Sequence, residues 1–149
     1  MTIILGADHG GYKLKETIKN WLIKQDYSII DVGADAFDPK DDYPLYAAKV
    51  ARQVVADKQA LGILFCRSGA GMTIAANKIK GIRAVEVFNP TSAKHAKEHN
   101  NANIISLSAD WLDLDQAKEI IDSFLKTEFT QEERHLRRIN QIHAVEAQL

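Results

Sequence analysis

The sequence predicts one α/β domain built on a five-stranded, mainly parallel sheet with crossover helices. Short runs rich in β-branched residues alternate with amphipathic stretches, which is the pattern of parallel strands joined by helices. The 149 residues, 46% of them hydrophobic, suffice for one buried core. No linker, repeat or low-complexity tract interrupts the chain. We therefore expect a single domain that spans residues 1–149.

The strands and helices can be assigned in order along the chain. Apolar and β-branched runs predict strands at residues 2–7, 28–32, 61–66, 82–87 and 104–107. After the first strand, one helical face carries the apolar residues Leu14, Ile18, Trp21 and Leu22. After the fifth strand, a second such face carries Ala117, Ile120, Ile121, Phe124 and Leu125. Each of these helices can therefore cover the sheet.

Two local signals mark the connections. The longest expected loop is 33–42, which contains Gly, Asp and Pro39. Ser92 is the expected N-cap of a helix over 93–100, because a serine hydroxyl can accept a hydrogen bond from an unpaired N–H group of the first turn.

The last stretch, 131–148, differs from the other expected helices. It is charged and helix-prone, with a thin apolar stripe at Leu136, Ile139 and Ile142. So narrow a stripe suits packing on a partner surface as much as on the chain's own core. We expect a C-terminal dimerisation helix.

Composition restricts the possible partners and the cellular setting. A net charge of −1 gives no global electrostatic case for binding nucleic acid or an anionic membrane. No apolar run approaches the length of a membrane span, and a strand pattern begins at residue 2, so we expect a cytoplasmic protein that acts on small molecules. The single cysteine, Cys66, cannot form an internal disulfide, and the scattered histidines make a poor structural zinc set.

The turn after the third strand is the expected centre of the chemistry. Cys66 ends that strand, and Gly69 and Gly71 follow it at the start of a helix. A helix N-terminus offers unpaired N–H groups and partial positive charge, which favour a thiolate or a neighbouring oxyanion. Cys66 could instead be a small buried hydrophobic residue. The two glycines favour a ligand site, because they allow close approach of the backbone.

Polar residues follow three of the expected parallel strands. Asp8 and His9 follow the first strand, Cys66 ends the third, and 89–92 follows the fourth. Ligands of open parallel sheets bind beyond the carboxyl ends of the strands, so these groups should face one crevice. Alone, Asp8 could be a helix cap and His9 a hydrogen-bonded polar residue; their convergence favours a site.

Two further groups are less specific. His99 lies near the end of the fourth crossover helix, where the helix dipole would also favour an imidazolium for structural reasons. Arg134 and Arg138 lie one helical turn apart and could grip one anion, although a solvated charged face is the commoner use of such clusters. We expect His95 and His143 to be surface residues.

Familiar phosphate and nucleotide motifs do not fit the turn. A P-loop needs Lys after the second glycine, and a cysteine-dependent phosphatase needs Arg six residues after its cysteine; Met72 occupies both positions. The dinucleotide fingerprint needs a small residue where Ile74 stands. A thiol beside an anion or oxyanion site remains, with no cofactor expected.

Six segments of the chain form a distinctive set: GADHGGYKLK at 6–15, DYPLYA at 42–47, CRSGAGM at 66–72, IAANK at 74–78, EHNNAN at 98–103 and RHLRR at 134–138. In these segments the chain resembles a known family, the type B ribose-5-phosphate isomerases and the related galactose-6-phosphate isomerase subunits. The six segments follow the family's order over nearly the whole chain. The resemblance implies a Rossmann-like three-layer sandwich. It also implies a homodimer or dimer of dimers, in which the partner's C-terminal region completes each active site.

The resemblance also implies an aldose–ketose isomerisation of a phosphorylated sugar through an enediolate, without cofactor or metal. Cys66 would be the base, Ser68 would move the proton between the sugar oxygens, and His99 with Asp8 would open the sugar ring. The turn residues Arg67, Gly69, Ala70 and Gly71 would stabilise the oxyanion. The phosphate would be held by His9, Arg134 and Arg138, and the sugar would be lined by Tyr43 and Asn100.

Two positions depart from the family's pattern. Arg67 replaces the usual glycine after the cysteine, and Asp110 stands where many members carry a phosphate-contacting arginine. Arg67 could supply the missing positive charge, or the substrate could be another phosphosugar with four or six carbons. Two other classes remain: a sugar-phosphate binding protein without catalysis, and a redox-sensing thiol protein, which would lack a resolving cysteine.

Overall fold

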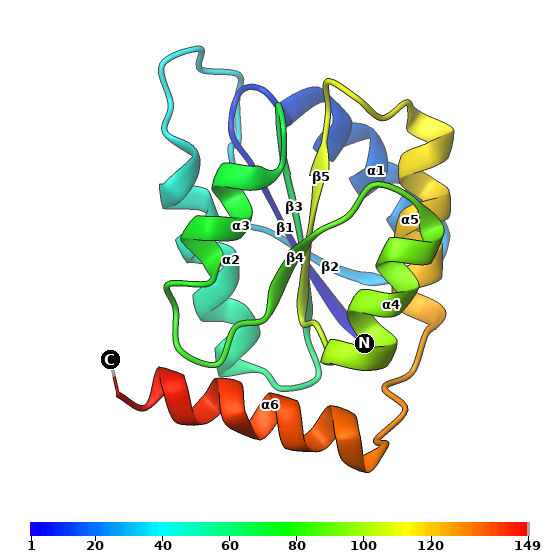
Figure 1. The fold of residues 1–149 in the computed structure, drawn as a ribbon. Helices are drawn as coiled ribbons and strands as arrows, with labels where there is room; N and C mark the ends of the chain where they lie inside the picture. The colour runs from blue at the N-terminus through cyan, green and yellow to red at the C-terminus, as the bar shows by residue number, and fades with distance from the viewer. Residues whose placement is uncertain (149) are drawn as a thin grey trace.

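Five parallel strands form the central layer of the computed structural model, which describes residues 1–148 (Figure 1). The strands are β1 (Thr2–Ala7), β2 (Ser28–Asp31), β3 (Leu61–Cys66), β4 (Ala84–Glu86) and β5 (Ile104–Ser108). Their order across the sheet is β2-β1-β3-β5-β4, and every neighbouring pair is parallel. The sheet is thus wholly parallel, where the sequence predicted a mainly parallel one.

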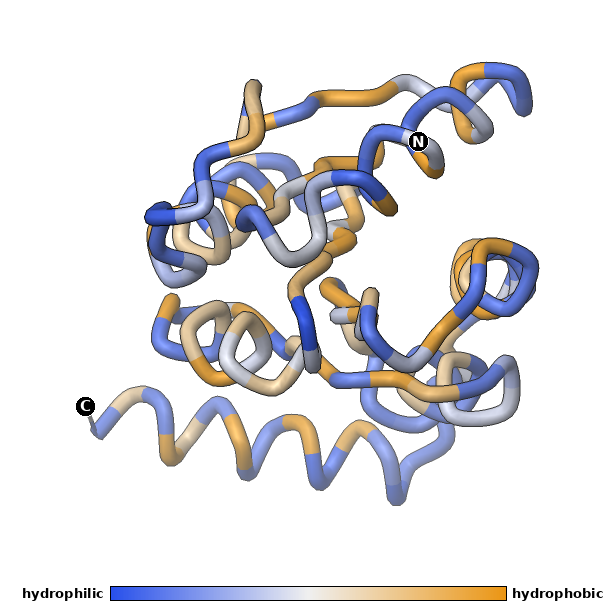
Figure 2. The backbone as a smooth tube through the Cα atoms, turned by 90° about the horizontal axis from the view of Figure 1, so that it is seen from above, coloured by the Kyte–Doolittle hydropathy of each residue, from blue (hydrophilic) through white to orange (hydrophobic). Residues whose placement is uncertain are grey.

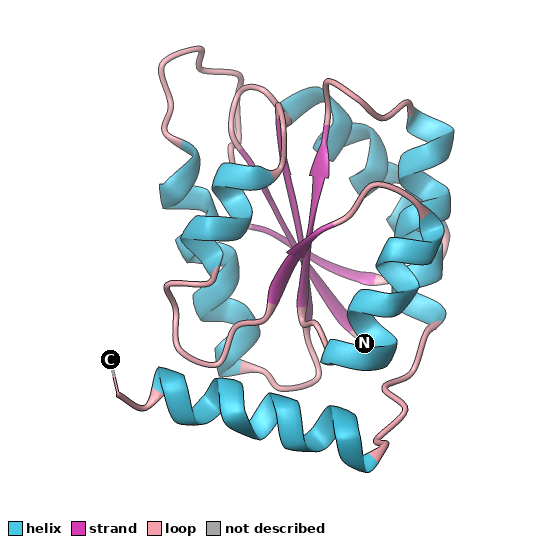
Figure 3. Ribbon diagram, viewed as in Figure 1, coloured by secondary structure: helices cyan, strands magenta, loops and turns pink. Residues whose placement is uncertain are grey.

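Six helices surround this sheet, and five of them cover its faces (Figure 3). The helices are α1 (Tyr12–Lys24), α2 (Tyr43–Ala56), α3 (Ala70–Ala76), α4 (Pro90–Asn100), α5 (Leu114–Lys126) and α6 (Glu133–Glu146). Residues of α2 and α3 pack on one face, and residues of α1, α4 and α5 pack on the other. The predicted Rossmann-like three-layer sandwich is confirmed.

The alternation of side chains along β1 and β3 builds the two halves of the core. Ile3 and Leu5 point toward α1, α4 and α5, whereas Ile4 points toward α2 and α3. In β3, Phe65 faces the first group of helices and Cys66 faces the second. Successive side chains of a strand alternate between faces, so the position of Cys66 at the end of β3 places its thiol on the α2 and α3 side.

The start of α4 corrects one prediction from the sequence. Ser92 does not cap the helix; the N-cap is Asn89, whose side chain accepts a hydrogen bond from the Ser92 N–H at 2.8 Å. The Ser92 hydroxyl accepts in return from the Asn89 N–H at 3.1 Å. The helix begins earlier than predicted because Pro90 has a fixed φ suited to the first helical position, and its missing N–H needs no partner there.

Helix α6 lies near the amino ends of the strands (Figure 1), and the view from above shows it running alongside the fold, apart from the two layers of covering helices (Figure 2). The Glu146 carboxylate accepts a hydrogen bond from the Gly81 N–H at 2.6 Å, just ahead of β4. Of the predicted apolar stripe, only Ile139 is buried, while Leu136 and Ile142 are exposed. Leu136 and Ile142 therefore leave apolar surface exposed on either side of the buried Ile139.

Within residues 1–148, no helix combines the length and apolar character needed to cross a bilayer.

Candidate functional site

Cys66 and the turn that follows it lie at the carboxyl edge of the sheet. The Gly69 N–H donates a hydrogen bond to the Cys66 Sγ at 3.0 Å. Gly69 has a φ of +94°, a backbone conformation that residues other than glycine rarely adopt. This conformation turns the chain back over the thiol. The Ser106 hydroxyl in β5 donates to the Gly69 carbonyl at 2.9 Å. The turn is thus held from both sides, and the Ala70 N–H donates to the Ser68 hydroxyl at 3.3 Å.

The electrostatics of Cys66 differ in direction from the sequence-based expectation. Burial raises the pKa of the Cys66 thiol above its usual range, and the charge of Asp8 raises it further. Hydrogen bonds from the N–H groups of Gly69, Met72 and Ser68 act in the opposite direction but do not outweigh burial. The sequence predicted a turn that favours the thiolate; the turn does so, but the enclosure of the thiol is the larger effect.

Asp8 lies beside this thiol at the end of β1. Its Oδ1 accepts a hydrogen bond from the Gly11 N–H at 3.1 Å. Gly11 packs directly on the Phe65 backbone, where an added Cβ would collide, so glycine lets the loop after β1 reach β3. Burial raises the pKa of the Asp8 carboxyl, with the Gly11 hydrogen bond opposing the rise. The structure thus brings together Asp8 and Cys66, as predicted.

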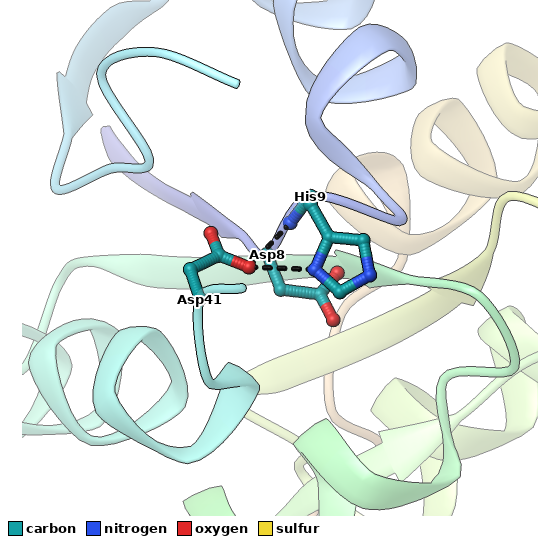
Figure 4. A group of neighbouring side chains, drawn as sticks. All are labelled: Asp8, His9 and Asp41. Carbon is teal, nitrogen blue, oxygen red and sulfur yellow. Dashed lines mark hydrogen bonds and ion pairs between the residues drawn. The ribbon is translucent and has the colours of Figure 1, made fainter. Parts of the chain in front are cut away.

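His9 contacts a residue that the sequence analysis did not identify. The Asp41 carboxylate accepts hydrogen bonds from both the His9 backbone N–H at 2.9 Å and the His9 Nδ1 at 2.7 Å (Figure 4). Asp8, His9 and Asp41 each offer an atom that can ligate a metal, and these atoms lie within 4.8 Å of one another. The His9 Nδ1 and the Asp41 Oδ1 are hydrogen-bonded to each other. We therefore interpret the two residues as a hydrogen-bonded pair and not as metal ligands.

Tyr43 and a charged pair lie next to the turn that follows Cys66. The Tyr43 ring lies against Gly71, where a Cβ would come within 2.7 Å of the Tyr43 Cζ. The Arg67 guanidinium lies 3.8 Å from the Asp110 carboxylate, and both side chains are largely exposed. Arg67 and Asp110, the two departures from the family's pattern, are therefore neighbours.

The second group of predicted site residues lies at the amino edge. His99 stands near the end of α4, with the His95 ring 4.8 Å away on one side and the His135 ring 4.6 Å away on the other. The His135 Nδ1 lies 2.9 Å from the Thr130 hydroxyl. Burial lowers the pKa of the His135 imidazole, and the charge of Arg134 lowers it further. His95 is exposed, as predicted, and so is His143.

The arginines of α6 share this amino edge. The Arg134 Nε donates to the Glu132 carboxylate at 2.8 Å, while Arg138 lies one helical turn further on and is exposed. Asn100, also exposed, ends α4 at the same edge, and its carbonyl accepts a hydrogen bond from the Arg83 Nε at 3.1 Å. These residues form a polar, accessible surface.

The two groups do not meet within one chain. Cys66 is the last residue of β3, whereas the segment after α4 meets the start of β3 through the Gly62 N–H and the Asn103 carbonyl at 2.8 Å. Four residue steps, from Gly62 to Cys66, span about 13 Å of strand. The C-terminal end of α4, with His99 and Asn100, and helix α6, with Arg134 and Arg138, thus lie at the opposite end of the strands from the turn after β3 (Figure 1).

The contacts or burial of three residues near these edges could not be predicted from the sequence. Asp41 stands in a loop with Asp35, Asp38 and Asp42, and no pattern distinguishes it from them. Ser106 alternates with apolar residues in β5, which marked it as a strand residue only. His135 sits among arginines in a segment that looked solvated, and its burial follows from the packing of α6.

The fold and the carboxyl-edge site together define a class: a doubly wound α/β protein with a thiol, a carboxylate and an imidazole beyond the ends of its strands, as in enzymes that act on small molecules. A family model described as Ribose/Galactose Isomerase matches residues 3–142. The chain therefore belongs to the ribose/galactose isomerase family.

Relatives of known name agree with this assignment. The chain is 40% identical over 140 residues to ribose-5-phosphate isomerase B of Mycobacterium tuberculosis, covering 94% of this chain and 86% of that protein. It is 41% identical to the ribose-5-phosphate isomerase B structure from Clostridium thermocellum, with a TM-score of 0.95 over 99% of each chain. A structure of the Mycoplasma genitalium enzyme with bound ribulose-5-phosphate is 38% identical, with a TM-score of 0.95 over 99% of this chain and 97% of that one.

Proposed function

We propose that this chain interconverts ribose 5-phosphate and ribulose 5-phosphate through an enediolate, with Cys66 as the base. The observation that carries the proposal is the Cys66 thiol held under a turn of backbone N–H groups, beside a buried carboxyl. The thiolate takes the proton from C2 of the open-chain sugar and, as the thiol, returns it to C1. Ser68 moves a proton between O1 and O2. The scheme uses no metal or redox cofactor.

The turn contributes by stabilising negative charge that develops on the sugar oxygen. N–H groups between Arg67 and Gly71 would donate to this oxyanion, and removal of one such donor typically costs about 100-fold or more in rate. Tyr43, whose ring lies over Gly71, would line the sugar. His9 would bind the phosphate from the other side of the crevice.

Ring opening would require a second copy of the chain. His99 would act on the ring oxygen with Asp8, yet the two belong to opposite edges of one sheet (Figure 1). In a homodimer, or a dimer of dimers, the partner would supply His99 and Asn100 to the crevice, and Arg134 and Arg138 to the phosphate. The exposed Leu136 and Ile142 of α6 are consistent with an interface on that helix.

A second candidate is an isomerase of another phosphosugar. The Arg67 and Asp110 pair favours it, because a carboxylate at the rim would repel a phosphate unless Arg67 compensates. A binding protein without catalysis is the remaining alternative, and the juxtaposed Asp8 and Cys66 argue against it.

The proposal is tested by incubating the protein with ribose 5-phosphate in deuterated water beside a Cys66→Ala variant. We expect ribulose 5-phosphate with deuterium at C1 from the wild type, and a rate lower by about 100-fold or more from the variant, since removal of a general base has this effect. Thermal unfolding of both proteins checks that the variant is folded. Equal exchange in both would exclude Cys66 as the base. No product from wild type, with turnover of allose 6-phosphate or a four-carbon phosphosugar, would establish the second candidate.

A further inference from the structure

Asp41 is a buried carboxylate in an otherwise exposed loop. Residues 35–40 of the segment between β2 and α2 are all exposed, but the Asp41 side chain keeps only 6% of its surface accessible. Removing a carboxylate from water costs free energy unless hydrogen bonds or charges compensate. The burial of this one side chain therefore calls for a partner. His9 provides it for the Oδ1, whereas among the described residues the buried Oδ2 accepts no hydrogen bond.

His9 contacts Asp41 through two of its nitrogen atoms. A single oxygen, the Asp41 Oδ1, accepts from the His9 backbone N–H and faces the His9 Nδ1 at 2.7 Å (Figure 4). A carboxylate can only accept, so the Nδ1 must carry a proton. This fixes the tautomer of the neutral ring and directs the Nε2 away from Asp41.

Aromatic contacts restrict the ring further. Phe37, from the same loop as Asp41, meets the His9 ring edge-on with centroids 6.4 Å apart. Tyr12 meets Phe37 in turn at 6.5 Å. The loop therefore contacts the imidazole through the carboxylate of Asp41 and the aromatic ring of Phe37. The His9 side chain remains 25% accessible.

We propose that Asp41 is the positioning residue for His9: it holds the imidazole by its Nδ1 and leaves the Nε2 to bind the phosphate as an imidazolium donor. This inference rests on the proposed function, which identifies the substrate that bears the phosphate. The negative charge of Asp41 compensates the imidazolium, and its hydrogen bond removes the freedom of the ring to rotate. Asp41 itself touches neither substrate nor reacting atoms.

A plain structural contact would have a different signature. If Asp41 only anchored the loop, its loss would loosen 33–42 without selecting a tautomer at His9. A metal held by Asp8, Asp41 and the Nδ1 of His9 would instead require that Nδ1 to be free of its proton. The tautomer of His9 therefore separates the three explanations.

The experiment compares Asp41→Ala, Asp41→Asn and the matched control Asp35→Ala, an exposed aspartate of the same loop. Two-bond nitrogen–proton NMR spectra of 15N-histidine-labelled protein report the tautomer of His9, assigned with a His9→Gln variant. We expect the Nδ1-protonated form in the wild type and in Asp35→Ala, and a shift toward the Nε2-protonated form in Asp41→Ala. Asp41→Asn, which keeps an acceptor oxygen, should retain part of the wild-type form.

Binding provides the second readout. Because a hydrogen bond to a charged group contributes about 1.5–3 kcal/mol, we expect the inhibition constant of inorganic phosphate and the KM for ribose 5-phosphate to rise about tenfold or more in Asp41→Ala, with kcat within about twofold. An unchanged tautomer together with unchanged phosphate affinity would overturn the inference. A changed tautomer and weaker phosphate binding, in a protein that turns over no ribose 5-phosphate, would support the inference while refuting the proposed function.

Discussion

The carboxyl and amino edges of the sheet carry two halves of a site built in different ways. At the carboxyl edge, Asp8, Asp41 and Cys66 are buried or nearly so, and each is fixed by a hydrogen bond to or from the backbone. At the amino edge, His99 and Arg134 are accessible and are held by contacts with their own or neighbouring helices. The first half is organised by strand ends, the second by helix ends.

The difference follows from the geometry of parallel sheets. Every strand ends at the same edge, so loops there converge, and each crossover helix returns its own C-terminus to the opposite edge. A residue such as His99, near the end of α4, therefore cannot reach a residue that follows a strand of the same chain. A second copy that presents its amino edge to the crevice would join the halves.

Mixed dimers of two inactive variants test whether the two edges form one shared site, and they give the largest expected effect. Cys66→Ala and His99→Ala should each lose activity by about 100-fold or more, as expected for loss of an acid or base group. When the two variants exchange subunits at random, about a quarter of all sites should be intact and activity should return to that level. Activity is followed after co-refolding, with native mass spectrometry to verify exchange.

The matched control for that experiment mixes Cys66→Ala with the double variant Cys66→Ala and His99→Ala, which can form no intact site. Restored activity there would indicate contamination. Verified exchange without any recovery in the first mixture would contradict shared sites and would leave the two edges functionally independent.

The pH dependence of the reaction tests the ionisation state of Cys66 at the carboxyl edge. Because burial raises the pKa of the Cys66 thiol, the thiolate is scarce at neutral pH and kcat/KM should rise about tenfold per pH unit until that pKa is reached. The same shift has a stability consequence: the folded state holds the proton more tightly, so the free energy of unfolding falls as pH rises above the ordinary thiol pKa. Iodoacetamide alkylation against pH measures the thiolate directly, and Cys66→Ala should lack the stability slope.

A flat rate profile between neutral and alkaline pH, with alkylation already complete at neutral pH, would mean that Cys66 is a thiolate in the resting protein. The effect of the helix N-terminus on the pKa of the Cys66 thiol would then outweigh that of burial, and the thiol would be ionised before the substrate binds.

The smallest expected effect concerns the rim. Arg67→Ala should raise the KM for the phosphosugar by up to about fivefold, the range of an exposed charge contact, because the Asp110 carboxylate would then lack its neighbour. Asp110→Ala should lower KM slightly. Steady-state kinetics with Arg52→Ala, an exposed arginine of α2, serves as the control. An unchanged KM in Arg67→Ala would remove Arg67 from phosphate recognition.

Much of the fold could be predicted because it depends on local periodicity. The bounds of β1 and β3 agree with the predicted 2–7 and 61–66, and the apolar faces around Ile18 and Ile120 are buried as expected. β4 is shorter than the predicted 82–87, at Ala84–Glu86, because the preceding residues belong to the turn from α3. The convergence of Asp8, His9 and Cys66 followed from the rule for parallel strand ends.

What could not be predicted depends on tertiary burial. Lys15 reads as a surface residue, yet it is fully buried, and its ammonium donates to the Asp31 carboxylate at 2.7 Å. Asp41 and His135 are polar residues in charged segments whose enclosure appears only when α6 and the 33–42 loop are packed. The net rise in the pKa of the Cys66 thiol could not be predicted for the same reason, because a helix start is visible in the sequence and the enclosure of the thiol is not.

The separation of His99 from Cys66 by the length of the sheet has a kinetic consequence under the proposed function. A lone copy could bind part of the substrate but could not open the sugar ring with its own imidazole. Dilution toward the dissociation constant of the dimer would then lower the specific activity, and well below it the rate would vary with the square of protein concentration. The amount of protein in the cell, as much as the chemistry of its thiol, would set how much sugar is converted.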